Sequence, residues 1–424
     1  MATIRCASDA GVTGCSEDVA LSRRGLLIGG ATLALWSFLP KSAIAGARDP
    51  RLLVVVLRGG LDGLSLAAPI GDPDFAKLRG RLALPVSGEG AGLPLDGFFT
   101  LNGAMPMLHA LYQKKEALIL HAVASPYRGR SHFDAQDVLE SGLGGGGKAT
   151  DGWLNRALAG MPSAGAAEKP KGLALAAVVP LVIRGSAPVL TWTPPAYRLP
   201  FRADTIARIT DLYGQTDPAL AKAFAAGIEI DRMADSTLDP KAGLKGKDGG
   251  GQPFREFTAA AEAAAKFLTT PGGPRIGALS VDGWDTHANE GAVKGLLANR
   301  LAGLDAAIKA FADGMGPAWQ DTVVLLVTEF GRTAQTNGTD GTDHGTATTA
   351  LLLGGAVKGG RVVADWPGLS QKALFEGRDL APTRDVRSIL KGILGDHLGI
   401  PQGVLAGKVF PDSASAAALG GLIG

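Results

Sequence analysis

Four strongly apolar segments of this chain are each followed at once by a loop rich in polar residues and glycine. The segments 51–57 (RLLVVVL), 117–123 (ALILHAV), 275–281 and 322–330 lead into the loops 58–65, 125–137, 282–289 and 329–346. Continuous apolar runs are typical of strands that are buried on both faces of a parallel sheet. In open α/β sheets, ligands bind beyond the carboxyl ends of the strands. We therefore expect an α/β fold with a central, mostly parallel sheet and helices on both faces, and we expect the four loops to meet at one edge.

The segments between these strands carry helical periodicity. Helices are predicted over 104–116, 132–141, 203–213, 218–232, 254–268, 292–315 and 384–398, and one more strand over 350–353. The glycine- and lysine-rich stretch near 235–253 predicts a mobile surface excursion. The remainder of 46–424 is expected to form a single domain.

The first 45 residues have the pattern of an export signal. Paired arginines, Arg23 and Arg24, precede an apolar run from Leu26 to Leu39, and residues 43–45 (AIA) match a small-residue cleavage site. The run is shorter than the roughly 20 residues that cross a bilayer. We expect a twin-arginine signal peptide over 1–45, the twin-arginine translocase as a partner during export, a periplasmic or secreted mature protein, and no stable membrane span.

Charge and cysteine content narrow the chemistry further. The chain has 42 Lys+Arg against 40 Asp+Glu, so it lacks the general basic field that nucleic acids or anionic membranes require. Both cysteines, Cys6 and Cys15, lie in the expected signal peptide. The mature protein would therefore have no disulfide and no cysteine nucleophile, and any metal must be held by oxygen and imidazole ligands.

Two of the polar loops carry histidine next to carboxylates. Asp285 and His287 are two residues apart, so in an extended loop both side chains face the same way, as a shared metal would require. The alternative is a turn in which Asp285 caps a helix and His287 is a surface residue. Asp343 and His344 lie between glycines, whose backbone can fold closely around a cation.

Two further carboxylates are candidate ligands by their position at strand ends. Glu329 follows an apolar strand, where it either binds a metal or pairs with Arg332. Asp62 follows the first strand, where it is either a ligand or part of a simple turn. These six residues provide four carboxylates and two imidazoles, enough for one or two divalent ions such as Zn, Mn, Mg or Ca.

A nucleophile and an anion-binding group are the remaining requirements of a hydrolytic site. Ser131 precedes the helix predicted over 132–141, where its hydroxyl is either a nucleophile stabilised by the helix dipole or an ordinary cap. His132 beside it is a candidate ligand or proton donor. Arginine suits bidentate binding of phosphate or sulfate oxygens, so the arginines flanking these loops suggest a small anionic or saccharide-linked substrate: Arg58, Arg128, Arg130 and Arg332. In contrast, His121 lies inside an apolar strand and is expected to be a core residue. His109 and His397 lie in predicted helices and are expected to have structural roles.

With these motifs in place, the chain resembles the exported bacterial family known as domain of unknown function 1501, which belongs to the alkaline phosphatase-like superfamily. The resemblance rests on LRGGLDGLS (57–65), SPYRGRSHFDAQD (125–137), DGWLNR (151–156), GWDTHAN (283–289), TEFGRT (328–333) and GTDHGT (341–346). It implies a bimetallic site at the carboxyl edge of a central sheet and a nucleophile at a helix start. In these terms Asp62 matches the first-strand aspartate, Ser131 the nucleophile, and Asp285, His287 and His344 metal ligands.

The chain also departs from the superfamily pattern at two places. Many members have Asp-His where this chain has Glu329 and Phe330, so one imidazole is missing. The run 125–128 (SPYR) misses the sulfatase spacing C/S-x-P-x-R by one residue.

These features predict an exported, metal-dependent hydrolase of phosphate or sulfate esters or a related anionic substrate. The competing hypothesis is an exported ligand-binding or assembly protein that keeps the metal pocket without turnover.

Overall fold

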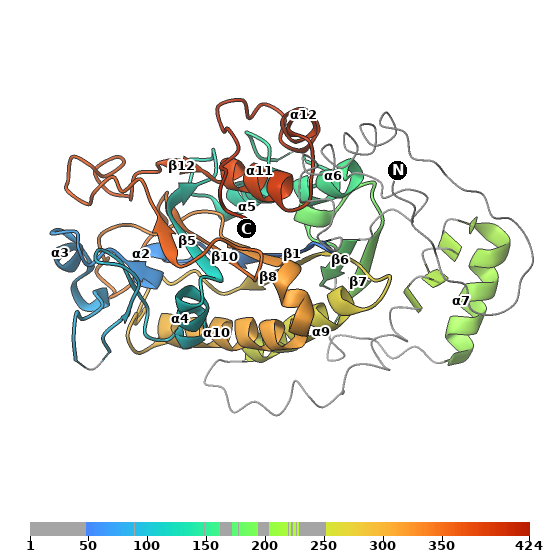
Figure 1. The fold of residues 1–424 in the computed structure, drawn as a ribbon, viewed down its shortest axis with the longest axis horizontal. Helices are drawn as coiled ribbons and strands as arrows, with labels where there is room; N and C mark the ends of the chain where they lie inside the picture. The colour runs from blue at the N-terminus through green and yellow to red at the C-terminus, as the bar shows by residue number, and fades with distance from the viewer. Residues whose placement is uncertain are drawn as a thin grey trace, which may run out of the picture. The chain divides into compact units, whose positions relative to one another are not determined.

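The structure is a computed structural model (Figure 1). At its centre lies a long, mostly parallel sheet. The described residues are 48–161, 172–193, 203–228 and 252–424, except positions 89, 148, 177, 219, 222, 223 and 226. Residues 49–424 belong to one compact unit. The expected signal peptide lies outside the described residues, as does most of the excursion near 235–253. Its last two residues, however, already belong to helix α9 (Gln252–Thr269).

Among the described residues, the main sheet has nine strands in the order β11-β5-β10-β9-β1-β8-β6-β7, and β12 pairs with β5. Their bounds are β1 Arg51–Arg58, β5 Ala117–Ala124, β6 Gly172–Leu175, β7 Val189–Trp192, β8 Ile276–Asp282, β9 Thr322–Val327, β10 Thr348–Leu353, β11 Arg361–Val363 and β12 Arg384–Asp385. A smaller antiparallel sheet has the order β2-β4-β3, from Ala67–Ala68, Thr100–Leu101 and Leu93–Pro94.

Strand direction brings the four polar loops to one edge. β1 runs parallel to β8 and β9. β10 is antiparallel to both β9 and β5, so β5 points the same way as β1, β8 and β9. All four strands therefore end at the same edge. Because β10 starts there, the loop between β9 and β10 also stays at that edge.

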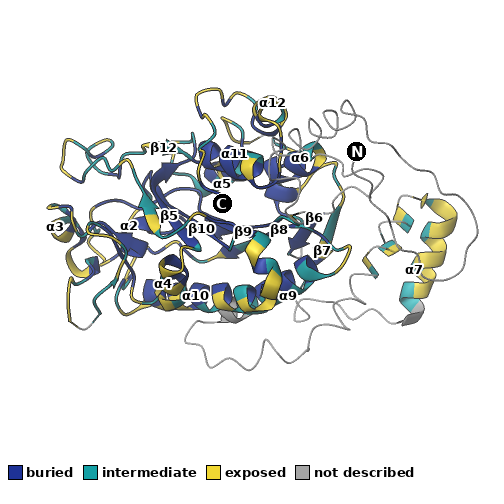
Figure 2. Cartoon of the chain, in the orientation of Figure 1, coloured by how far each residue is buried: buried dark blue, intermediate teal, exposed yellow. Residues whose placement is uncertain are grey.

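Helices cover both faces of the sheet, as the continuous apolar strands require. Leu53, Val55 and Leu57 of β1 pack in one core with residues of the helices α4 (Pro106–Gln113), α9 and α10 (Leu296–Met315). Leu52 and Val54 pack in a second core against α6 (Trp153–Gly160) and α11 (Val386–Asp396). Figure 2 shows the buried strands between two layers of helices; α4 and α10 carry exposed residues, whereas α11 is buried from Val386 to Leu394. The expected fold class, a mostly parallel sheet with helices on both faces, is confirmed.

The remaining helices differ in how well the sequence predicted their bounds. Helix α5 (His132–Ser141) has the predicted bounds, because Ser131 is the N-cap and Gly142 provides the left-handed residue, with φ 72°, that ends the helix. Helix α7 extends over Ala203–Thr216, whereas α10 begins four residues later than predicted, at Leu296. The strand predicted over 322–330 ends at Val327, so Glu329 lies in the following loop. Among the described residues, no helix is long and apolar enough to cross a membrane.

His121 lies inside β5 and is the core residue that the sequence predicts. Its Nε2 is 3.0 Å from the carbonyl oxygen of Ala67, and its Nδ1 accepts a hydrogen bond from the Ala122 amide. Complete burial lowers the pKa of His121 to about 4. The native protein therefore keeps this imidazole neutral.

This pKa predicts a loss of stability in mild acid. The unfolded chain takes up a proton near the ordinary pKa of about 6.5, and the native chain does not until about 4. Stability is therefore fully present above about pH 6.5 and falls by about 3 kcal/mol towards pH 4. Urea denaturation across this range should show a weaker pH dependence for His121→Gln than for the unaltered protein. The variant His109→Gln, at a partly buried histidine on α4, should keep the original dependence. Equal slopes for all three proteins would contradict the prediction.

Candidate metal centre

The loop after β8 is extended, and this decides where its polar side chains point. Trp284 and Thr286 are buried, at 0% and 1% exposure, whereas Asp285 and His287 are exposed. This alternation has the period of two that an extended chain produces. Asp285 and His287 therefore lie on the same side, and His287 Nε2 is 3.0 Å from Asp285 Oδ1. The expectation that this pair faces one way agrees with the geometry.

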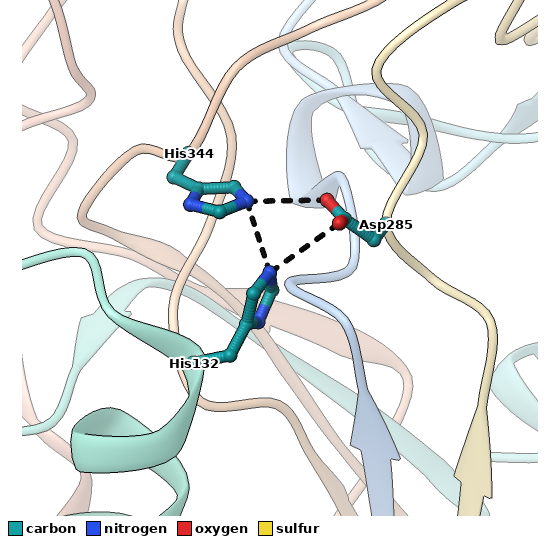
Figure 3. A group of neighbouring side chains, drawn as sticks. All are labelled: His132, Asp285 and His344. Atoms are coloured by element: carbon teal, nitrogen blue, oxygen red, sulfur yellow. Dashed lines mark hydrogen bonds and ion pairs between the residues drawn. The ribbon is translucent and has the colours of Figure 1, made fainter.

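Two histidines from other loops join this pair, and Figure 3 shows both of them beside Asp285. His344, from the loop between β9 and β10, places Nε2 3.2 Å from Asp285 Oδ1 and 3.0 Å from His287 Nε2. His132, the first residue of α5, places Nε2 2.9 Å from His344 Nε2 and 3.5 Å from Asp285 Oδ2. The ligand atoms of His132, Asp285 and His344 all lie within 4.8 Å of one another. The loops after β5, β8 and β9 thus each contribute to one cluster.

Each imidazole of the cluster is held from behind through its other ring nitrogen. His132 Nδ1 is 2.7 Å from Glu329 Oε1, and His344 Nδ1 is 3.0 Å from the carbonyl oxygen of Arg130. His287 Nδ1 is 3.4 Å from Asp343 Oδ1. Since carboxylates and carbonyls accept hydrogen bonds, these contacts place a hydrogen on each Nδ1. In a neutral ring Nε2 then presents its lone pair to the cluster, the arrangement found in metal-binding histidines.

Three converging lone pairs and a carboxylate need a cation between them. Around an ion with bonds of about 2.0 to 2.1 Å, tetrahedral ligand atoms are about 3.3 Å apart. The separations here are 2.9 to 3.5 Å. The geometry of His132, Asp285 and His344, whose ligand atoms all lie within 4.8 Å of one another, therefore fits one ion. His287 lies beside them, with its Nε2 3.0 Å from both Asp285 Oδ1 and His344 Nε2. The alternative to a metal ion is a proton shared between two of the imidazole rings, which the same short contacts between Nε2 atoms would also allow.

Glu329 and Asp343, expected as ligands, lie on the Nδ1 side of the imidazoles and not among the converging atoms. Glu329 is 1% exposed and accepts hydrogen bonds from Gln136 Nε2 and the Gly59 amide in addition to its contact with His132. Burial alone would raise the pKa of Glu329, but these donors outweigh it, so the pKa lies below its usual value. The ionised carboxylate orients His132.

Arg332 fixes the carboxylate of the cluster. Its Nη1 donates to Asp285 Oδ1 at 2.6 Å, and its Nε and Nη2 bind the side chain and carbonyl oxygens of Thr342. Burial opposes ionisation of Asp285, but Arg332 and the neighbouring histidines lower the pKa of Asp285 below its usual value. Arg332 is 1% exposed. Its geometry is that of a residue that positions Asp285.

Asp62 lies apart from the cluster. Its carboxylate caps the short helix α2 (Gly63–Leu66) by accepting from the amides of Leu64 and Ser65, and it forms a buried ion pair with Arg79. Arg79 lies in α3 (Phe75–Arg79), a segment that the sequence patterns did not mark. Burial would raise the pKa of Asp62, but Arg79 together with Glu290, Ser65 and Arg332 outweighs burial, so the pKa is lowered. The prediction missed this pair because α3 is only five residues long and carries no motif.

Three expected substrate-binding arginines are engaged by protein groups. Arg58 pairs with Glu140, and Arg128 Nη1 donates to the carbonyl oxygens of Ser125 and Tyr127. Arg130 pairs with Asp379 and Glu376. Their guanidinium groups therefore stabilise the loops around the cluster. Only the backbone carbonyl of Arg130 contacts a cluster residue, His344.

Ser131 occupies the N-cap of α5, as expected, but its hydroxyl makes no capping hydrogen bond. Its backbone is extended, with φ −90° and ψ 125°. The first amides of α5 therefore have no side-chain cap, and they lie beside the cluster because His132 is the first helical residue.

Two glycines allow the loops of the site to cross in close contact. A Cβ on Gly59, which has φ +122°, would lie 2.5 Å from the Asp285 amide nitrogen. A Cβ on Gly341 would lie 2.2 Å from the His287 carbonyl oxygen. Both distances are too short for any side chain, so the backbones carrying Asp285 and His287 are packed directly against glycine.

The role of Glu329 can be tested without touching a cluster residue. Glu329→Gln keeps the size of the side chain but weakens the charge-assisted hydrogen bond to His132. Loss of such an orienting contact typically lowers metal affinity about 10- to 100-fold. Competition with a fluorescent zinc chelator should show this loss. Asp313→Asn, at a surface ion pair on α10, is the control; unchanged affinity in Glu329→Gln would contradict the assignment.

The buried pair of Asp62 and Arg79 predicts a large effect on stability. Arg79→Met would leave Asp62 buried without its cation, which typically costs about 3 to 5 kcal/mol. Urea denaturation should show this loss, and Arg81→Met, at an exposed pair with Asp340, should cost less than about 1 kcal/mol. Similar stabilities of the two variants would be inconsistent with the buried pair.

Comparisons with known proteins place the chain in a family. The similar solved structures include a phosphonate monoester hydrolase of Agrobacterium radiobacter, with 10% identity, TM-score 0.31 and coverage of 83% of this chain and 74% of that one. They also include the zinc complex of the C-terminal periplasmic domain of EcEptC from Escherichia coli, with 11% identity, TM-score 0.33 and coverage of 73% and 74%. The PsFucS1 sulfatase from Pseudoalteromonas sp. has 11% identity, TM-score 0.33 and coverage of 81% and 68%.

No curated protein matches the chain. The model of one family, described as protein of unknown function (DUF1501), matches residues 114–409. That range covers more than half of the chain and includes all four residues of the cluster, so the chain belongs to the DUF1501 family.

Proposed function

We propose that the protein binds one divalent metal ion at the cluster and uses it to hydrolyse a phosphate or sulfate ester or a related anionic substrate. The main support for a bound metal is that three Nε2 atoms converge on Asp285, while each ring is oriented through its Nδ1. Imidazole-rich ligation suits borderline ions such as zinc or manganese better than magnesium or calcium, which prefer oxygen ligands.

The surroundings of the cluster support a single ion. Glu329 and Asp343 orient imidazoles, and Asp62 is bound to Arg79. The remaining acidic candidates therefore do not form a second cluster near the first among the described residues. A bound ion of this kind supplies a lowered pKa for bound water and polarises an ester oxygen.

The protein groups that would bind an anion differ from those that the sequence suggested. Arg58, Arg128 and Arg130 are engaged elsewhere. The start of α5, in contrast, presents amides that no side chain caps, and helix N-termini attract anions. The side chains of His132, His344, Asp285 and His287 are 23%, 25%, 39% and 47% exposed. An anionic group could reach both the ion and these amides, with Ser131 next to them.

One observation favours the alternative, a protein that binds a metal without turnover. With His287 added to the group of His132, Asp285 and His344, the ion would have four protein ligands. Four-coordinate zinc sites that use only protein ligands are typically structural. Turnover would require an open coordination position on the ion for water or substrate. His287 is the most exposed of the four residues, so its position is the one that an incoming group reaches most easily.

Metal content is the first test. The full chain should contain about one divalent ion per molecule by inductively coupled plasma mass spectrometry, and His344→Ala should lose it because one of four ligands is removed. His109→Ala, at a partly buried histidine on α4 that contacts the carbonyl oxygen of Pro94, should keep the ion. Absence of a bound ion after incubation with zinc and manganese would end the proposal.

Turnover separates the two functions. The metal-loaded protein is expected to hydrolyse at least one of 4-nitrophenyl phosphate, bis(4-nitrophenyl) phosphate and 4-nitrophenyl sulfate, and Ser131→Ala shows whether this hydroxyl takes part. A stoichiometric ion with no hydrolysis of any of the three esters would support the binding protein.

A further inference from the structure

A pocket of about 540 Å³ lies beside the metal cluster. One wall is a single face of α5, formed by Phe133, Gln136, Asp137 and Glu140. These residues follow the helical spacing i, i+3, i+4 and i+7, which places them on one side of a helix. The opposite walls include Arg58, at the end of β1, and the segment after β6 that ends at Arg184. The pocket thus lies along the same edge of the sheet as the cluster.

The pocket and the cluster share a wall. Gln136 lines the pocket, and its Nε2 donates to Glu329 Oε1 at 3.0 Å. The same oxygen contacts Nδ1 of His132. Phe133, on the pocket side, directly follows His132 in the sequence. A molecule in the pocket would therefore lie within one or two side chains of the candidate ion.

Charges in the pocket do not favour an anion. Glu140 is neutralised by Arg58 and also accepts a hydrogen bond from the Val182 amide. Arg184 Nη2 donates a hydrogen bond to the carbonyl oxygen of Val179. Two further acids, Asp134 and Asp137, also line the pocket. Together these three acids and two arginines leave the pocket with a net negative formal charge, so the anionic part of a substrate belongs at the ion and not here.

The polar groups and the rim point to a polyhydroxylated ring. Carboxylates accept hydrogen bonds from hydroxyl groups, arginine donates to them, and the Gln136 amide can do either. At the rim, Phe133 is 86% exposed and Val178 is 75% exposed. A sugar ring combines hydroxyl edges with a C–H face that packs on an aromatic side chain. Binding pockets typically combine such apolar surface with a few placed polar groups.

We propose that this pocket binds a carbohydrate ring, which would form the alcohol part of the ester. This inference rests on the proposed function for the ester, but the pocket itself does not depend on the ion. Sugar binding can therefore be measured in protein from which metal has been removed with a chelator.

Saturation-transfer difference NMR on the full, metal-free chain tests the pocket. The probes are methyl β-D-galactopyranoside, methyl α-D-glucopyranoside and N-acetylglucosamine, with cyclohexanol as a ring lacking the hydroxyl pattern and ethanolamine as a cationic ligand. We expect transfer to the ring C–H protons of at least one sugar and none to cyclohexanol. Absence of transfer to all three sugars, or transfer to ethanolamine alone, would overturn the proposal.

Variants of Phe133 connect the binding to this pocket. Phe133→Ala removes an exposed ring and should weaken sugar binding about tenfold without unfolding the protein, whereas Phe133→Tyr should keep binding. Val86→Ala, at an exposed residue outside the pocket (79% exposed), should bind as the unaltered chain does. Equal sugar binding by Phe133→Ala and Phe133→Tyr would overturn the assignment. If the protein binds sugars but holds no ion, only the proposed hydrolysis fails; if it holds an ion and binds no sugar, only the pocket fails.

Discussion

The direction of β10 determines where the residues of the cluster lie. Because β10 is antiparallel to both β9 and β5, β5 ends at the same edge as β1, β8 and β9. The loop from β9 to β10 leaves and re-enters the sheet at that edge, and it carries both Arg332 and His344. With a parallel β10 this loop would have to cross to the opposite edge, and His344 could not meet Asp285. The pairing of one strand is thus the condition for the whole cluster.

The groups around the cluster form layers with distinct roles. The side chains of the cluster point their possible ligand atoms toward one another. A second set of groups orients these side chains by contacts with the imidazole Nδ1 atoms and with Asp285: Glu329, the carbonyl of Arg130, Asp343 and Arg332. Farther from the cluster, Glu290 Oε2 accepts from the Thr342 hydroxyl, and Thr342 binds Arg332. Burial and the neighbouring Asp62 raise the pKa of Glu290 well above its usual value. Both effects disfavour a further negative charge among the buried groups behind Asp285.

The sequence predicted the scaffold better than the individual roles. The strands of the central sheet are buried on both faces, so each leaves a continuous apolar run that is easy to recognise, and the polar loops follow directly. Side-chain direction in irregular loops leaves no such pattern. Spacing could not show that Glu329 lies behind His132, or that Asp62 would pair with Arg79 of a five-residue helix. The short strands β6 and β7, of four residues each, were missed because runs of this length are not distinctive.

The close crossing at Gly341 has a consequence for how this protein can vary. A loop whose backbone touches the backbone of His287 cannot gain a side chain at that point, and it cannot change length without displacing a neighbour. Sequence drift in this loop should therefore be confined to positions such as Gly338, which is exposed. Thr339, although also exposed, donates a hydrogen bond to the carbonyl oxygen of His287. The number of residues between Glu329 and His344 is then constrained. A relative with a longer loop would need a different arrangement of residues to hold a cation.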